Sequence, residues 1–326
     1  MGKIVLAHIS DLHFASRILN DRFTGIPHRI GHDKVLALGL TTALEDLPIH
    51  SQINDPINVV VSGDLTRAGS ESEFAVAHTL LRSTARLTQV APPDLLGYAV
   101  RDDQYASVPG NHDQYGAGFM AAQNPAVTGV HFEVTPWHRR FEDSNDQVTL
   151  DLFGIDTNSG FIPAPQGGNF LAWGGISTQQ FTQLEHLLNT NPPVPGRTVR
   201  ALMMHHSLSY LGGTVGSLIW MSALLPLSRT RLRRICANHG IAAILTGHTH
   251  TLLCKQLQAR TAGGAQRTFW ELRSWSTLVG PRKLNGFLAH EIANRPGGGV
   301  SWETYAYPWR SGSFRRQAQA VASFIV

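Results

Sequence analysis

The chain has 326 residues, of which 42% are hydrophobic and 15% are charged, a composition typical of a soluble globular protein and not of a disordered one. Its 27 basic and 23 acidic residues suit an anionic ligand, but the excess is too slight for a dedicated nucleic-acid binder. The two cysteines exclude a disulfide framework and an all-thiolate zinc site, and no apolar run reaches the roughly 18 residues of a membrane-spanning helix.

The first third of the chain contains three short apolar segments that each end in polar residues. Continuous apolar runs of this length are typical of buried strands, and polar groups at strand ends can converge on one site. The segments are Lys3–Ile9 before Ser10-Asp11-Leu12-His13, Ile57–Ser62 before Gly63-Asp64, and Tyr105–Val108 before Pro109-Gly110-Asn111-His112-Asp113. Between the first two, leucines at helical spacing predict a helix that begins after Asp33 as N-cap and ends at Pro48.

The middle of the chain alternates further strand and helix patterns. A strand is predicted at Leu150–Ile155, a helix at Ser177–Leu188, and a second helix at Arg229–His239 that Gly240 closes. Two more apolar strands end in histidines: Val199–Met204 before His205-His206, and Ile241–Thr246 before Gly247-His248-Thr249-His250.

After Thr251 the pattern changes to aromatic, β-rich stretches separated by turn residues. These stretches, Thr268–Leu278, Gly286–Ile292 and Val300–Tyr307, predict antiparallel hairpins. Alternating strands and helices followed by hairpins indicate a layered α/β fold. We expect a single domain over residues 1–326, with a motif-bearing core at 3–255 and a β-rich portion at 256–326 that completes the second sheet.

Eight polar residues follow the five predicted strands, and one shared site would satisfy all of them. Buried charges and imidazoles need partners, and two divalent cations bridged by a carboxylate would supply them. Mixed imidazole, carboxylate and amide ligands suit Mn²⁺, Fe or Zn²⁺. The eight residues are Asp11, His13, Asp64, Asn111, His112, His205, His248 and His250.

In this order, the five polar motifs resemble the signature of the calcineurin-like metallophosphoesterases. The resemblance covers roughly residues 3–251 and is greatest for the bacterial cyclic-nucleotide phosphodiesterase branch, with similarity also to the DNA-repair exonuclease branch. It implies an α/β fold, a four-layer sandwich in which two mixed β-sheets are flanked by α-helices.

The resemblance also implies a role for each matched residue. Seven ligands would hold two divalent transition-metal ions: Asp11, His13 and His250 for the first, Asn111, His205 and His248 for the second, and Asp64 as the bridge. His112 would contact the phosphate and protonate the leaving oxygen, and Asp113 would orient His112. Asn111 would also face the substrate.

The implied activity is that of a dinuclear-metal-dependent phosphoesterase, in which a metal-bridging hydroxide attacks phosphorus. The expected substrate is a small phosphodiester such as a cyclic nucleotide. The alternative is a nuclease, or a hydrolase of a phospholipid headgroup or another large phosphodiester. A non-catalytic scaffold of the same fold would be indicated by a missing ligand, and no motif position is missing.

Other residues leave two readings open. His206 could replace His205 as a ligand or contact the substrate, Asn158 could face the substrate or be a turn residue, and His8 could pack behind the site or reach it. The basic residues of 229–234 could form a solvated helix face or an anion-binding patch. Four basic or imidazole side chains in the loop after the first motif could bind a phosphate or be solvated. They are Arg17, Arg22, His28 and Arg29.

Two long connections, 160–175 and 207–226, could form a lid, a wall for an apolar group or an oligomer interface. In the second, Tyr210, Trp220 and Met221 supply the apolar character. We expect no stable nucleic-acid partner and no membrane span, and a homo-oligomer stays open. The N-terminal segment has no secretory signal pattern, so the expected compartment is the cytoplasm.

Overall fold

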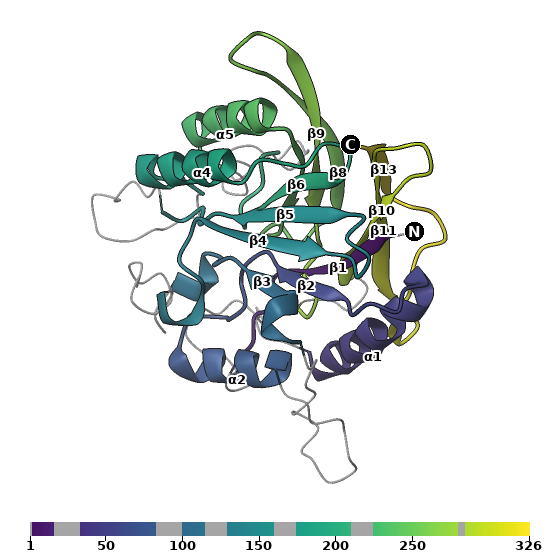
Figure 1. Cartoon of the computed structure of the whole chain (residues 1–326). Helices are drawn as coiled ribbons and strands as arrows, with labels where there is room; N and C mark the ends of the chain where they lie inside the picture. Colours follow the sequence, from purple (N-terminus) through teal and green to yellow (C-terminus); the bar gives the residue numbers. More distant parts are fainter. Residues whose placement is uncertain are drawn as a thin grey trace, which may run out of the picture.

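Two mixed β-sheets lie face to face at the centre of the molecule, and helices cover the outer face of each (Figure 1). The computed structural model describes residues 2–15, 33–82, 100–114, 129–159, 174–209, 224–279 and 284–326. Helices α1 (Lys34–Ser51) and α2 (Glu71–Arg82) lie on one side, and α4 (Thr178–Thr190) and α5 (Pro226–His239) on the other. This arrangement confirms the predicted four-layer α/β sandwich.

The first sheet has seven strands in the order β12-β11-β10-β1-β2-β3, with β13 paired to β11. Strands β1 and β2 are parallel, as are β2 and β3, whereas β1 and β10 are antiparallel. The strands are β1 (Lys3–Ile9), β2 (Asn58–Val61), β3 (Tyr105–Ser107), β10 (Gly286–Asn294), β11 (Val300–Arg310), β12 (Ser313–Phe314) and β13 (Ala322–Ile325).

The second sheet has six strands in the order β4-β5-β6-β7-β9-β8. Strands β5, β6, β7 and β9 run parallel, and β4 and β8 form its antiparallel edges. The strands are β4 (Trp137–Glu142), β5 (Thr149–Gly154), β6 (Thr198–Met203), β7 (Ile241–Thr246), β8 (Leu253–Arg260) and β9 (Gln266–Arg273). Short 3₁₀ helices occur at Asp102–Gln104 and His112–Gln114.

Strand β1 is apolar on both faces because it lies between two layers. Its side chains alternate across the sheet: Ile4 and Leu6 pack in the core between the sheets, whereas Val5 and Ile9 pack against the layer of α1 and α2. A third core lies between the second sheet and the outer helices α4 and α5, with Phe153, Leu184 and Leu232 among its members. Continuous apolar strands therefore follow from burial on both faces.

Two of the three expected helix starts are confirmed by their capping bonds, whereas α5 begins at Pro226 and not at Arg229. The carboxylate of Asp33 accepts from the backbone N–H groups of Val35 and Leu36, and the hydroxyl of Ser177 accepts from that of Gln180. The expected end at Pro48 is wrong, because α1 continues to Ser51. Pro48 lies in the last turn, where it removes one N–H donor and the helix ends within a turn anyway.

The C-terminal portion contributes to both sheets, and not to one as expected. Most of β8 and all of β9 form an edge of the second sheet, whereas β10 to β13 form more than half of the first. The reason is the pairing of β10 with β1 along six residue pairs, from Lys3 opposite Ala293 to His8 opposite Leu288. The division of the chain as one domain stays a prediction.

The buried guanidinium of Arg200 on β6 joins the ends of two helices. It donates to the carbonyl of His239 at 3.1 Å, to that of Leu188 at 2.9 Å and to that of Asn191. These carbonyls lie at the C-terminal ends of α4 and α5, where backbone acceptors have no partner within the helix. A cation there also complements the helix dipoles.

Candidate metal centre

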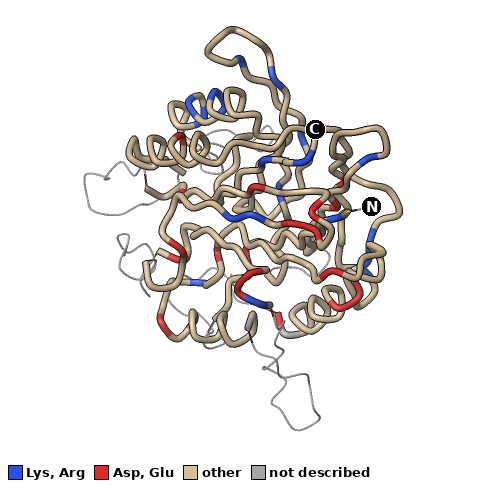
Figure 2. The backbone as a smooth tube through the Cα atoms, in the orientation of Figure 1, with Lys and Arg blue, Asp and Glu red and all other residues tan. Residues whose placement is uncertain are grey.

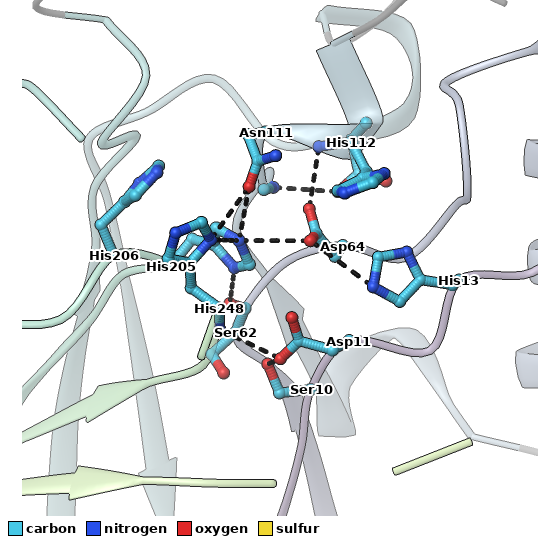
Figure 3. Close-up of polar contacts among 12 residues, drawn as sticks. Ser10, Asp11, His13, Ser62, Asp64, Asn111, His112, His205, His206 and His248 are labelled. Carbon is cyan, nitrogen blue, oxygen red and sulfur yellow. Dashed lines mark hydrogen bonds and ion pairs between the residues drawn. The ribbon is translucent and has the colours of Figure 1, made fainter. Parts of the chain in front are cut away.

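The polar residues predicted from the motifs lie together where three parallel strands of the first sheet and two parallel strands of the second sheet end (Figure 3). Asp11 and His13 follow β1, Asp64 follows β2, and Asn111 and His112 follow β3. His205 follows β6, and His248 and His250 follow β7. Backbone bonds hold the first two loops together, because Asp11 N donates to Gly63 O at 3.1 Å and His13 N to Asp64 O at 3.0 Å.

Three groups of side chains offer ligand atoms within 4.8 Å of one another. They are Asp11, His13 and His250; His13, Asp64 and His112; and Asp64, His205 and His248. The first and third correspond to the two ligand sets that the resemblance implies, apart from the amide Asn111. The structure thus brings every predicted ligand into one place.

Asp64 occupies the middle of this arrangement. Its Oδ2 lies 3.4 Å from Nε2 of His205 and 3.7 Å from Nε2 of His13, which belong to the two different ligand sets. Its Oδ1 accepts a hydrogen bond of 2.9 Å from the backbone N–H of His112. One carboxylate therefore faces both sets at once, as a bridging ligand must.

Asn111 completes the second set through its amide oxygen. This oxygen lies 3.1 Å from Nε2 of His205 and 3.1 Å from Nδ1 of His248, and these two nitrogens are themselves 3.1 Å apart. The Nδ1 of His205 lies 2.8 Å from the backbone carbonyl of Ser62, which can only accept. Nδ1 of His205 therefore carries a proton, and Nε2 is the nitrogen that points to the shared centre.

Several buried polar atoms of the site have no hydrogen-bond partner, which is costly unless a cation occupies the centre. Both ring nitrogens of His13 and Oδ1 of Asp11 are in this state. Nε2 of His250 lies 3.2 Å from that oxygen, close enough for an ion pair although not directed as a hydrogen bond. Nitrogen and carboxylate donors left in this way fit divalent transition-metal ions.

Burial and mutual charge shape the titration of the site. Burial would raise the pKa of Asp11, but the neighbouring His250 and His205 outweigh it and lower the pKa to about 2. Burial would lower the pKa of His205, but Asp64 and Asp11 raise it to about 9. Burial and the nearby His112 lower the pKa of His13 to about 3. The carboxylates are thus ionised and His13 is neutral, the forms that bind metal, whereas the raised pKa of His205 means that a metal ion must displace the proton from its Nε2.

Five ligand-type residues adopt a left-handed backbone, which costs a residue with a Cβ roughly 1–3 kcal/mol. They are Asp11 with φ of 51°, His13 with 47°, Asp64 with 52°, His248 with 71° and His250 with 53°. Strain of this kind concentrates at functional sites. The sharp turns that it produces place consecutive side chains of each loop toward one centre.

Two motif glycines are required by close approach of other loops. A Cβ at Gly110 would overlap the backbone nitrogen and carboxylate of Asp64, and a Cβ at Gly247 would overlap the hydroxyl of Ser10 beside Asp11. Each glycine therefore lets one ligand-bearing loop pack directly on another.

His112 lies at the edge of the centre and is partly exposed. Its ring contacts that of His13 edge to face, with 4.6 Å between centroids, and its Nδ1 lies 2.7 Å from the carbonyl of Arg67. His248 and His250 are the other two site histidines that reach solvent, whereas Asp11, His13, Asp64 and His205 are buried. The partly exposed histidines therefore form the open side from which a substrate would approach.

Asp113 was predicted to orient His112, but its carboxylate bonds other groups, and Nδ1 of His112 bonds the carbonyl of Arg67. The carboxylate of Asp113 accepts from the backbone N–H groups of Leu65, Thr66 and Gly110 and from the hydroxyl of Thr66. Asp113 therefore ties the loop after β2 to the loop after β3. Burial, followed by the charge of Asp64, raises its pKa to about 7.

His206 and Asn158 lie beside the centre and bond residues of neighbouring loops. Nδ1 of His206 bonds Thr157 Oγ1 at 2.7 Å, and its ring lies beside the rings of His205 and His248, with 5.1 and 4.4 Å between centroids, and apart from Asp64 (Figure 3). The side chain of Asn158 donates to Asp156 at 2.8 Å and to the carbonyl of Pro109 at 3.3 Å. Of the adjacent histidines His205 and His206, His205 is therefore the one that lies in a ligand group. Contacts of His206 and Asn158 with the substrate stay predictions.

His8 packs behind the site, one of the two readings left open. It is fully buried, with Nε2 2.9 Å from the hydroxyl of Ser62 and Nδ1 3.3 Å from Nε2 of His290. His290 continues to Thr304 at 3.0 Å. This chain of bonds crosses four neighbouring strands of the first sheet.

Sequence reasoning missed the polar segment that ends β9 and follows it. The hydroxyl of Ser276 donates to the carbonyl of Asp11 at 2.9 Å, Thr277 N donates to Ser10 O at 2.9 Å, and Ser274 Oγ donates to His8 O at 3.2 Å. These small hydroxyl residues follow no known ligand spacing, so the sequence gives little signal for them. The four residues Arg17, Arg22, His28 and Arg29 and most of the two long connections lie outside the described residues.

The calcineurin-like phosphoesterase profile matches residues 4–252 of the chain. A search of curated proteins found no match. Among solved structures, the chain is similar to GAP50, described as the anchor in the inner membrane complex of Plasmodium, with a TM-score of 0.57, 11% identity, and coverage of 100% of this chain and 89% of that chain.

Two further structures have the same fold. Purple acid phosphatase PPD1 from yellow lupin (Lupinus luteus) gives a TM-score of 0.56 and 12% identity over 99% of this chain and 53% of that chain. A 5'-nucleotidase from Staphylococcus aureus, titled as putative, gives 0.50 and 14% over 94% of this chain and 54% of that chain. The chain thus spans about half the length of these two proteins, and at such identity the likeness shows the fold alone.

Proposed function

The chain belongs to the calcineurin-like phosphoesterase family, and from this premise we propose that it hydrolyses a small phosphodiester with the help of two divalent metal ions. The observation that carries the proposal is the position of Asp64 between two histidine sets, in a buried centre where both ring nitrogens of His13 and Oδ1 of Asp11 have no hydrogen-bond partner. A purely structural cluster would leave those groups uncompensated.

Seven residues would hold the two ions, in the sets given above around Asp64. When bound, such ions lower the pKa of water and offset the charge of a phosphate. Their identity among Mn, Fe and Zn stays part of the proposal. No motif ligand is absent, which argues against a non-catalytic scaffold.

His112 is placed to move a proton at the open side of the centre. The carbonyl of Arg67 can only accept, so Nδ1 of His112 donates to it and keeps its proton. The other nitrogen, Nε2, is then the one that can hold and release a proton to a leaving oxygen. A partly exposed ring in contact with His13 suits this role as general acid.

A second candidate, a nuclease, is favoured by the charge at one end of the molecule. Residues 224–273 contain eight Lys and Arg and one acidic residue, the buried Glu271. Figure 2 shows the basic positions on α5 and on the protruding β8–β9 hairpin. Against this, Arg231 is paired with Glu185 at 3.3 Å and packs over Phe181, as expected for a solvated helix face.

The test compares nitrophenyl phosphate mono- and diesters, cyclic nucleotides and single-stranded DNA in Mn²⁺-replete buffer. We expect turnover of small diesters whose kcat/KM changes little between low and physiological salt. Turnover of DNA with steep salt dependence and no cyclic-nucleotide hydrolysis would establish the nuclease instead. Absence of turnover of every ester, with metal bound, would refute an enzymatic function.

None of the described helices has both the length and the apolar character needed to cross a bilayer. The cytoplasmic location, the absence of a stable nucleic-acid partner and the oligomeric state stay predictions. The phosphoester substrate class is the family's, and the preference for a diester is our proposal.

A further inference from the structure

We propose that Glu271 and Arg273 are positioning residues that fix the two loops carrying His205, His248 and His250. Both lie at the end of β9, outside the five polar motifs, and both are buried, with 0% and 2% exposure. The proposal rests on the metal centre of the proposed function and names residues that set its geometry.

Glu271 holds the segment that follows His205 and His206. Its Oε1 accepts from the hydroxyl of Ser207, from Leu208 N at 2.9 Å and from Ser209 N at 3.4 Å. Three donors from consecutive residues on one carboxylate oxygen fix the direction in which the backbone leaves β6. The bonds begin two residues after His205, so a shift of this segment would move its ring.

Arg273 joins that segment to the loop after β7. Its Nη1 donates to Ser207 Oγ at 3.1 Å, and its Nε donates to the carbonyl of Thr251 at 3.2 Å. Thr251 directly follows His250. One planar guanidinium therefore joins the loop of His205 to the loop that carries His248 and His250, one ligand from each metal set. Ser207 Oγ lies between the opposite charges of Arg273 and Glu271.

Strand order explains why β9 can take this role. β9 pairs in parallel with β7, with Leu245 opposite Leu272 and Thr246 opposite Arg273, so its end lies beside the start of the Gly247–His250 turn. The left-handed backbone at His248 and His250 is strained, and such turns persist when surrounding contacts over-determine them. Arg273 supplies one such contact at the end of the turn.

A buried arginine and glutamate could instead serve only the stability of the sheet. The distinction is that positioning residues alter metal binding, whereas a structural pair alters unfolding of the metal-free protein alone. Outer partners of metal ligands typically change metal affinity by 10–100-fold. The test therefore measures binding and stability separately.

The variants are Arg273→Met, Arg273→Lys and the milder Ser207→Ala, with Arg267→Met as a matched control on the exposed part of β9. Mn²⁺ affinity is measured by equilibrium dialysis, the Co²⁺ site by its absorption spectrum, and the thermal midpoint in EDTA. We expect Arg273→Met and Ser207→Ala to weaken Mn²⁺ binding about 10–100-fold. Arg273→Lys should recover part of the loss, because one ammonium cannot span both acceptors as a planar fork does.

The Co²⁺ spectrum should change in the variants and stay that of the wild type in Arg267→Met. Mn²⁺ affinity and Co²⁺ spectra equal to the wild type in folded Arg273→Met and Ser207→Ala would overturn the proposal, whatever the thermal midpoint. If Arg273→Met does not fold, Ser207→Ala and Arg273→Lys decide. A wild-type protein that binds neither ion would refute the metal centre itself, which is a different failure from equal binding by wild type and variants.

Discussion

The buried pair His8 and His290 should make the protein lose stability as the solution becomes mildly acidic. Burial lowers the pKa of His8 from 6.5 to about 3, although the nearby Asp11 acts in the opposite direction. Burial, together with His8, also holds the pKa of His290 well below its usual value. Both rings are therefore neutral in the folded protein, where they bond each other, Ser62 and Thr304.

The sign follows from which state binds more protons. Below pH 6.5 the unfolded chain protonates His8 while the folded chain does not, so stability is full above pH 6.5 and falls as pH decreases toward 3. Between pH 7 and pH 5 the loss for His8 is about 2 kcal/mol, and His290 adds to it in the same direction. This is a large share of a typical total of about 5–15 kcal/mol.

The assay is urea unfolding of EDTA-treated protein at pH 7 and pH 5, followed by tryptophan fluorescence. His8→Gln keeps a hydrogen-bonding side chain and removes the titration, so it should be less stable at pH 7 yet lose about 2 kcal/mol less than the wild type on acidification. The exposed His186→Gln serves as control and should follow the wild type. Equal losses in His8→Gln and wild type would show that this ring is not held neutral.

Three further predictions concern the site and the fold. The variant His112→Ala should keep its metal and lose roughly 10²–10⁴-fold in kcat. The loss should be smaller for nitrophenyl esters, because their leaving group needs little protonation. Equal losses for good and poor leaving groups would contradict the role of His112 as general acid. Gly110→Ala should displace Asp64 and weaken Mn²⁺ binding in equilibrium dialysis, and unchanged affinity would contradict the packing argument. Arg200→Met leaves three helix-end carbonyls without their donor and should cost about 2 kcal/mol or more in urea unfolding, whereas a cost near zero would mean that water replaces the guanidinium.

The sequence predicted best those strands that are buried on both faces. The bounds of β1 and β7 were predicted to the residue, because each is a continuous apolar run with a polar or glycine tip. Edge strands were missed for the opposite reason: β4 reads Trp-His-Arg-Arg-Phe-Glu, and much of β8 is exposed, so neither has an apolar run. Helix α2 was also missed, although Phe74, Ala77 and Leu81 lie at helical spacing and pack in the core.

In the site, the metal-ligand residues could be predicted from the sequence, whereas the residues that hold their loops in place could not. Ligand residues occur in short motifs at strand ends, so spacing identified them, and the structure brings them into one centre. The groups that hold those loops are scattered: Arg67 offers a backbone carbonyl, and Glu271 and Arg273 lie on a strand far along the chain. Contacts through backbone atoms leave no pattern in side-chain type, which is why Asp113 was assigned to His112 and not to the backbone that it binds.

The pairing of β1 with β10 has a consequence for how the protein folds during its synthesis. The strand that leads to Asp11 and His13 acquires one of its two neighbours from a segment 280 to 290 residues later in the chain. Until that segment emerges from the ribosome, β1 presents an open, apolar edge, the kind of surface on which chains aggregate. Pairing across so long a loop is also slow. We therefore expect the nascent chain to depend on chaperones, and a fragment that ends before β10 to contain all the ligand residues without the ability to assemble them.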